Sequence, residues 1–204
     1  MAFIIMTTTL IQRGLLAAAL TAAALGAHAA DFTFNGNINF HNDVVQIDFS
    51  VDAPTTIKLW TDSWQGGLNF DPLLTLFAAD GSQVAGGSND DNDSIGVGQG
   101  YYDSGLLLTT LAGHYRLTLT AASNEAIGPL LANGFTYSAD APIALSNWVQ
   151  PSSDINKGDQ KGGFWRVHLD GASMAVAVPE PSTYAMLLAG LLVIGCMGGR
   201  RRHS

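Results

Sequence analysis

Two stretches, Val45-Gln46-Ile47-Asp48-Phe49-Ser50-Val51 and Tyr115-Arg116-Leu117-Thr118-Leu119-Thr120-Ala121, decide the fold. In each of them apolar side chains alternate with polar ones, which is the pattern of a β-strand with one buried face. Residues 165–170 repeat this pattern, and shorter β-branched or aromatic runs predict strands at 32–38, 55–60, 73–77, 83–85 and 105–111. The sequence therefore predicts an all-β fold, an antiparallel β-sandwich or jelly roll, in one ectodomain spanning residues 30–171.

Polar segments between these runs predict tight turns. Asp80-Gly81, within Ala79-Asp80-Gly81-Ser82, supplies the positive φ that a hairpin needs. A second turn is expected at Leu111-Ala112-Gly113-His114. Residues 124–163 fit no strand of this scheme.

The two ends of the chain have the composition of targeting segments. Arg13 precedes an alanine-rich apolar run at 14–26 that ends in Ala27-His28-Ala29, which predicts a secretory signal peptide at 1–29 with a helical apolar region. At the other end we expect a linker at 172–183, a transmembrane helix at 184–199 and a basic cytoplasmic tail at 200–204. A buried alanine-rich helix and an ordinary anchor with a proline-rich stalk are the alternatives.

Proline and arginine residues near the C-terminus predict an extended segment and the orientation of the chain in the membrane. Pro179 and Pro181 hold the backbone extended around Glu180, a shape that suits a peptidase cleft. Arginine residues beyond the apolar run favour a cytoplasmic C-terminus, so the ectodomain lies outside. These residues are Arg200, Arg201 and Arg202.

The charge of the domain argues against nucleic-acid binding, and its cysteine content argues against stabilisation by disulfides. The chain has 9 Lys and Arg and 17 Asp and Glu, of which Arg13, the three terminal arginines and Glu180 lie in the targeting segments. The domain between them keeps 5 basic and 16 acidic residues, a net charge of −11. Such a domain repels nucleic acid and attracts cations. The one cysteine, Cys196, lies in the apolar tail, so no disulfide can stabilise the domain.

Two family resemblances follow from motifs in order along the chain. The runs 70–81, 89–91, 103–106 and 111–117 resemble the bacterial pre-peptidase C-terminal domain, a small jelly-roll sandwich of secreted proteins, over about residues 32–121. Relative to its shortest members, residues 124–163 look like an insertion. Residues from Val178 onward resemble the PEP-CTERM sorting signal of Gram-negative bacteria.

The second resemblance implies a route and partners. It implies export across the inner membrane after cleavage by signal peptidase, a precursor anchored by its C-terminal helix, and processing by exosortase, a membrane-embedded cysteine peptidase. The protein then reaches the cell surface or the extracellular space. Bacteria that use this signal commonly make exopolysaccharide, which is the expected partner.

The first candidate site is the acidic loop Asn89-Asp90-Asp91-Asn92-Asp93-Ser94, which Asp71 and Asp103 flank in the sequence. Calcium takes six to eight oxygen ligands, and carboxylates one residue apart can converge on one ion. We therefore consider a calcium site; a solvated loop that keeps the sheet end soluble is the alternative. Its candidate ligands are Asp71, Asp90, Asp91, Asp93 and Asp103.

Aromatic side chains beside polar loops are the second candidate site, because their apolar faces can stack on sugar rings. Capping of the sandwich ends is the alternative reading. Four residues are candidates for glycan contact, Trp60, Trp64, Tyr101 and Tyr102, and Trp148 has a similar setting.

Catalytic motifs are missing from the sequence. His41, His114 and His168 are dispersed, and the chain has no Gly-x-Ser-x-Gly, no His-Glu-x-x-His and no phosphate loop. The expected function is a non-catalytic surface protein linked to exopolysaccharide. A carbohydrate-binding or calcium-dependent adhesion module is one alternative, and an undetected hydrolase is another.

Overall fold

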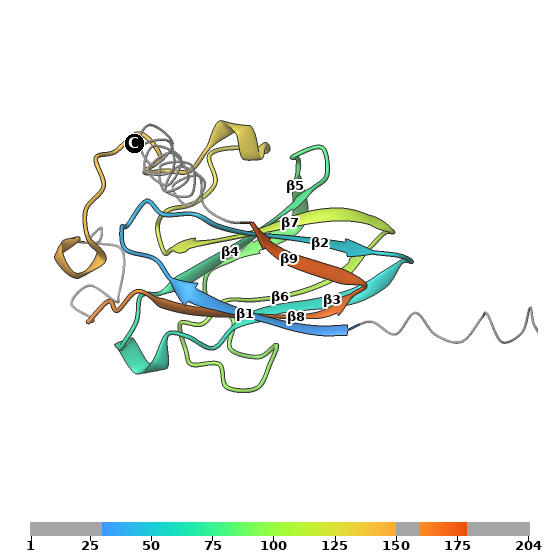
Figure 1. Ribbon diagram of the computed structural model, residues 1–204, viewed down its shortest axis with the longest axis horizontal. Helices are drawn as coiled ribbons and strands as arrows, with labels where there is room; N and C mark the ends of the chain where they lie inside the picture. Colours follow the sequence, from blue (N-terminus) through green and yellow to red (C-terminus); the bar gives the residue numbers. More distant parts are fainter. Residues whose placement is uncertain (1–29, 150–159, 179–204) are drawn as a thin grey trace, which may run out of the picture.

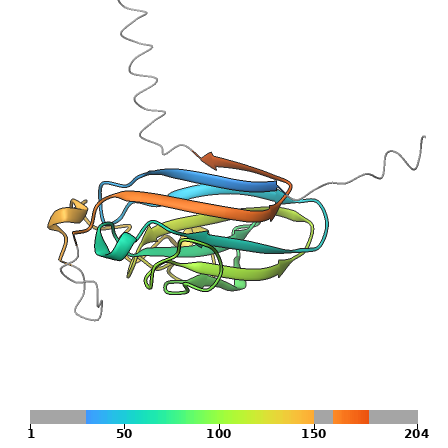
Figure 2. The same cartoon turned by 90° about the horizontal axis from the view of Figure 1, so that it is seen from below.

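Two antiparallel sheets, stacked face to face, make up the domain (Figures 1 and 2). The computed structural model describes residues 30–149 and 160–178. One sheet has the order β1 (Ala30–Asn37), β8 (Phe164–Ala172), β3 (Thr55–Thr61), β6 (Gly105–Thr110). The other has the order β5 (Gln83–Asn89), β4 (Pro72–Ala78), β7 (Gly113–Ala121), β2 (Val45–Val51), β9 (Met174–Val178). The predicted all-β sandwich is confirmed.

The two stretches with the clearest alternation pair with each other in the five-stranded sheet. In the β2–β7 register Ile47 lies opposite Leu117, and Asp48 lies opposite Arg116. The apolar pair is buried between the sheets, and the charged pair lies on the outer face. One-residue slippage would exchange these two faces, so burial of the apolar set fixes the register.

The Asp-Gly hairpin forms as predicted. It joins β4 to β5, where Gly81 adopts a φ of 83°. The Asp80 carboxylate accepts hydrogen bonds from the backbone N–H and the hydroxyl of Ser82, and these bonds lower the pKa of Asp80. The turn at 111–114 forms too, but it joins β6 of one sheet to β7 of the other. Local turn chemistry therefore does not tell whether two strands share a sheet.

The last strand lies where the sequence predicts a linker. β9 pairs with β2 from Met174 opposite Ser50 to Val178 opposite Gln46. Ser173 connects it to β8, donating its backbone N–H to the Ser50 carbonyl and accepting from the backbone of Asp52. The folded domain thus runs to Val178, beyond the predicted boundary at 171, since β9 completes the five-stranded sheet.

The segment that resembles an insertion has an aromatic cluster of its own. The structure describes this segment at 124–149 and 160–163, and the first part contains the short 3-10 helices η2 (Leu131–Asn133) and η3 (Leu145–Asn147). The ring centroids of His41 and Trp148 lie 5.2 Å apart, and Tyr137 contacts both. Lys161 donates to the Trp148 carbonyl at 2.9 Å. Trp148 is buried, so it belongs to the core and not to a polar loop surface.

Several expectations concern residues outside the described ranges. They are the signal peptide at 1–29, the transmembrane helix at 184–199, the motif Pro179-Glu180-Pro181 and the arginines at 200–202. Within the described residues, no helix is both long and apolar enough to cross a membrane.

The packing gives a first prediction. Leu59 of β3 is fully buried, whereas Leu107, in the adjacent strand β6, is 56% exposed. Leu59→Ala removes buried methyl groups and leaves a cavity, which should lower the free energy of unfolding by about 2–5 kcal/mol. Leu107→Ala, the matched control, should change it by less than about 0.5 kcal/mol. Urea denaturation of both variants measures the difference; equal losses would contradict this description of the core.

Candidate functional site

Three of the predicted calcium ligands come together at one end of the five-stranded sheet. Asp71 immediately precedes β4, and Asp90 and Asp91 immediately follow β5, its antiparallel neighbour. One carboxylate oxygen from each of the three lies within 4.8 Å of the others. Asp71 is buried and Asp91 is exposed. Oxygen atoms from three carboxylates this close repel one another, and a divalent cation would relieve that repulsion.

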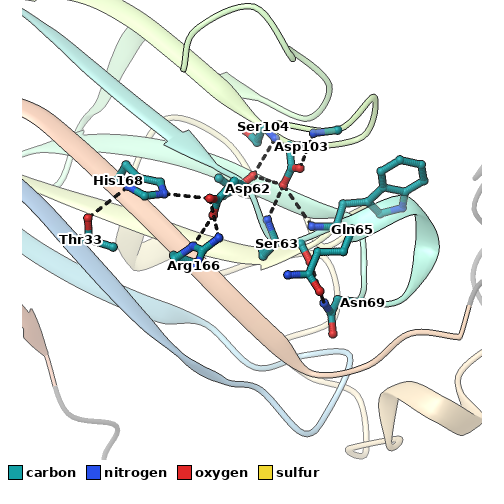
Figure 3. Close-up of polar contacts among 12 residues, drawn as sticks. Thr33, Asp62, Ser63, Gln65, Asn69, Asp103, Ser104, Arg166 and His168 are labelled. Atoms are coloured by element: carbon teal, nitrogen blue, oxygen red, sulfur yellow. Dashed lines mark hydrogen bonds and ion pairs between the residues drawn. The ribbon is translucent and has the colours of Figure 1, made fainter. Parts of the chain in front are cut away.

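The other two predicted ligands lie outside this group. Asp93 is exposed on the same loop. Asp103 is buried, and its Oδ1 accepts from the Thr61 hydroxyl at 2.8 Å and from the backbone N–H groups of Ser63 and Trp64 at 2.9 and 3.2 Å. Its Oδ2 accepts from the Gly100 N–H at 2.7 Å. The first three bonds tie the end of β3 and the loop after it to the loop before β6, and the fourth lies within that second loop (Figure 3).

This tie also positions three of the four candidate aromatic residues. Trp64 and Tyr102 meet edge to face with ring centroids 4.9 Å apart, and Tyr101 meets Tyr102 in the same way at 4.7 Å. Tyr101 is well exposed, and the other two rings are partly buried. The three rings form a small aromatic cluster at one end of the sandwich, with Tyr101 as its outermost member.

Trp60 lies elsewhere, on the outer face of the four-stranded sheet. Its ring stacks on His168 of the adjacent strand β8 at 4.8 Å and 14°. The backbone of Gly96 lies directly against the indole, since a Cβ at that position would come within 2.1 Å of it. His168 and Gly96 thus cover part of the Trp60 indole. A sugar could contact only the part of the ring that these two residues do not cover.

A polar network beside Trp60 was not foreseen from the sequence (Figure 3). The side chain of Asp62, only 9% exposed, accepts two hydrogen bonds of 2.6 Å from Arg166. These bonds raise the pKa of the Arg166 guanidinium. The Asp62 carboxylate also lies 3.2 Å from His168 Nε2, and the other ring nitrogen lies 3.1 Å from the Thr33 hydroxyl. The network joins β1, β8 and the residue that follows β3, so the strand order of the sheet is needed to predict it.

The ionisation of a nearby acidic residue, Asp170, is altered by its surroundings. Burial raises the pKa of Asp170, on the outer face of β8, and a hydrogen bond with Asp31 and the charge of that carboxylate raise it further. Lys58, opposite Asp170 on β3, acts in the reverse direction. Folding therefore disfavours the ionised form of Asp170, and this cost grows as the pH rises from the ordinary pKa of 3.8 to the raised pKa of the folded state and is constant above it.

The role of Asp103 gives a prediction. Asp103→Asn replaces one acceptor oxygen by an N–H donor, which faces backbone donors, so the free energy of unfolding should fall by about 3 kcal/mol. Asp93→Asn, in the exposed part of the neighbouring loop, should leave it nearly unchanged. Urea titration in buffer that contains calcium and in buffer that contains EDTA separates a structural role from a metal-dependent one. A loss confined to calcium-containing buffer would assign Asp103 to a metal site instead.

Comparisons with known proteins address the fold and the tail separately. The domain is similar in structure to the pre-peptidase C-terminal domain of collagenase from Bacillus anthracis, at 12% identity and a TM-score of 0.36, over 68% of this chain and 88% of that one. It is also similar to PliG of Aeromonas hydrophila, a periplasmic inhibitor of g-type lysozyme, at 12% identity and a TM-score of 0.31, over 76% and 90%.

A third similar structure is a family 35 carbohydrate binding module from Clostridium thermocellum, at 16% identity and a TM-score of 0.24, over 68% of this chain and 90% of that one. No curated protein sequence matches the chain. A family model does match its C-terminal end over residues 177–202, and it describes the PEP-CTERM protein-sorting motif. The chain therefore combines a two-sheet antiparallel β-sandwich with a PEP-CTERM sorting motif, which implies an exported precursor that exosortase processes.

Proposed function

We propose that this chain is a non-catalytic surface protein that is delivered by its sorting motif and associates with extracellular polysaccharide. The observation that carries the proposal is the sorting motif at 177–202, which begins within β9, the last described strand of a folded domain. The acidic composition of that domain disfavours binding to nucleic acid and to anionic lipid.

The aromatic cluster supports the association with polysaccharide. Trp64, Tyr101 and Tyr102 present aromatic surface on loops that Asp103 holds in place. Aromatic faces bind the C–H faces of sugars, and a rigid loop loses little conformational entropy when it does so. Weak contacts of this kind suit attachment to a repetitive polymer, because many of them act together.

A hydrolase is the rival that needs weighing, because Thr33, His168 and Asp62 lie in the order hydroxyl, imidazole, carboxylate. In hydrolases the carboxylate of such a row orients the imidazole and stabilises its positive charge. Here Arg166 occupies both oxygens of that carboxylate and already balances its charge. The stacked Trp60 ring covers one face of the imidazole as well. These contacts favour a structural network on the sheet surface.

Calcium-dependent adhesion is a second candidate function, favoured by the convergence of Asp71, Asp90 and Asp91. A bound calcium ion would join the start of β4 to the loop after β5, and water or backbone carbonyls would complete its coordination. The loop that it would fix leads on to the aromatic cluster, so calcium would act on the same surface.

The sorting route and the polysaccharide association are tested together in the native host. Wild-type protein should be recovered from the extracellular polysaccharide fraction without the terminal Arg200-Arg201-Arg202. Alanine at Pro179, Glu180 and Pro181 should leave an intact terminus in the membrane fraction, and Glu125→Ala, at an exposed position in the domain, should behave as wild type. Mass spectrometry of each fraction reads the termini. An intact terminus in the wild type would refute processing, and processed protein free of polysaccharide would refute the association.

Calcium binding predicts a shift in thermal stability. A ligand at about 100 times its dissociation constant stabilises a fold by about 2.7 kcal/mol, so excess calcium should raise the melting temperature by several degrees relative to EDTA. Asp90→Asn should abolish most of this shift, whereas Asp93→Asn should retain it because Asp93 lies outside the cluster. Superimposable melting curves of the wild-type protein in calcium and EDTA would reject the site.

A further inference from the structure

A groove of about 380 Å³ opens on the outer face of the five-stranded sheet. Its lining residues come mainly from β2, β7, the edge strand β9 and the turn that joins β4 to β5. Figure 1 shows where these strands lie. The volume of the groove falls at the lower end of the range for small-molecule sites, roughly 300–1,000 Å³. It is remote from the aromatic cluster, because it adjoins the β2 end that leads into β3, whereas Trp64 follows the opposite end of β3.

The polar part of the groove is a balanced ion pair. Arg116 of β7 and Asp48 of β2 lie opposite each other in the register and form two hydrogen bonds, from Nε to Oδ1 at 2.6 Å and from Nη2 to Oδ2 at 2.8 Å. Both side chains remain more than a third exposed. A guanidinium has five N–H donors and a carboxylate about four acceptor positions, so the pair uses only part of its capacity. The unused N–H donors of Arg116 and acceptor positions of Asp48 therefore lie side by side, where a ligand in the groove can bind them.

The apolar part of the groove comes from both of its sides. On β9, Met174 and Val176 lie opposite Ser50 and Asp48 of β2, directly beside the ion pair, and both are well exposed. Toward the other side the lining residues are small or apolar: Ala78, Ala79, Gly81 and Leu131. The groove therefore combines apolar surfaces with a central row of hydrogen-bonding groups.

These features select one class of ligand. With histidine neutral, Asp48 and Arg116 are the charged residues among those that line the groove, and their charges cancel. An anion would meet the Asp48 carboxylate and a strongly acidic domain, and a cation would meet the Arg116 guanidinium. A purely apolar ligand would cover the unused polar groups of the pair, which costs free energy.

We infer that this groove binds a neutral sugar residue of a glycan chain. Adjacent hydroxyls of the sugar would accept from Arg116 and donate to Asp48, while its C–H groups would contact Met174 and Val176. The inference rests on the proposed function, since it names a ligand and a place for the polysaccharide association. It adds a contact on β9, β2 and β7 to the one proposed for the aromatic cluster.

Met174 provides a direct probe. Of the 5 methionines in the chain, Met174 alone lies between the signal peptide and the C-terminal segment. The full chain, labelled with ¹³C at its methionine methyl groups and held in a detergent without a sugar headgroup, is titrated with methyl glucoside, methyl galactoside and methyl mannoside. Met174→Leu assigns the signal. At least one neutral glycoside should shift the Met174 methyl resonance saturably, and methyl glucuronide should bind about tenfold more weakly or not at all.

Two variants and a control locate the effect. Val176→Lys introduces a charge into the apolar side, and the double variant Asp48→Asn, Arg116→Gln removes the ion pair without changing the net charge; each should weaken binding at least about tenfold. Val97→Lys adds the same charge at a loop residue that is 92% exposed and should bind as wild type. The melting temperature of each variant shows that the fold is intact.

The outcomes separate this inference from the proposed function. Retention of the wild-type chain on the host's polysaccharide that Val176→Lys does not reduce would overturn the groove and leave the proposed function standing. Saturable glycoside binding without any retention on that polysaccharide would support the groove and count against the proposed function. Failure of every neutral glycoside to shift Met174, or tighter binding of the glucuronide, would overturn the groove.

Discussion

Burial of side chains between the two sheets is the interaction on which the rest of the structure depends. The domain has no cysteine, so no disulfide restricts its unfolded state. Its stability must therefore come mainly from apolar residues that alternate along the strands, among them Ile47, Leu59 and Leu117. Each such side chain contributes about 1.5–3 kcal/mol when fully buried. The same alternation sends Asp48, Arg116 and His168 to the outer faces, so the candidate binding surfaces arise from the core pattern.

Buried carboxylates fix the conformation of the loops at one end of the sandwich. Asp103 gathers four hydrogen bonds at one end of the sandwich, and Asp62 joins Arg166 and His168 across the adjacent strands. Charged groups are costly to bury unless they are hydrogen-bonded, so these loops can close only in the geometry that satisfies them. The acidic chain thus uses part of its negative charge for internal structure. A different group of carboxylates, those of Asp71, Asp90 and Asp91, is the one that could hold a metal ion.

Alternation along the sequence predicts the fold because a single period identifies each strand. It predicts β2, β7 and most of β8, and the Asp80-Gly81 hairpin follows from its turn residues. β9 was missed because its residues, Met174 to Val178, are all apolar and show no period of two. The burial of Trp148 was missed because its neighbours, His41 and Tyr137, are distant in the sequence.

The candidate sites show the same limit. The sequence predicts that Asp90, Asp91 and Asp93 of one loop act together with Asp71 and Asp103, which flank that loop in the sequence. Sheet pairing brings only Asp71, Asp90 and Asp91 into one group. Nothing in composition distinguishes a carboxylate that accepts backbone hydrogen bonds from one that could bind a metal ion, since both are aspartates beside a strand. The Asp48–Arg116 pair could have been anticipated, because opposite charges occupy the outward positions of the two clearest strands. What was needed is their register, which depends on long-range pairing.

Strand β9 joins the sorting motif directly to the folded domain. The sorting motif begins at residue 177, so its first residues belong to a strand that pairs with β2 as far as Val178. Pro179 comes next and lacks the N–H that a further ladder bond would need. Cleavage beyond Val178 therefore removes the tail and keeps the whole sheet, whereas cleavage before Met174 would remove an edge strand and one side of the groove. Because no spacer separates β9 from the sorting motif, a sorting peptidase that releases a complete domain must cleave beyond Val178.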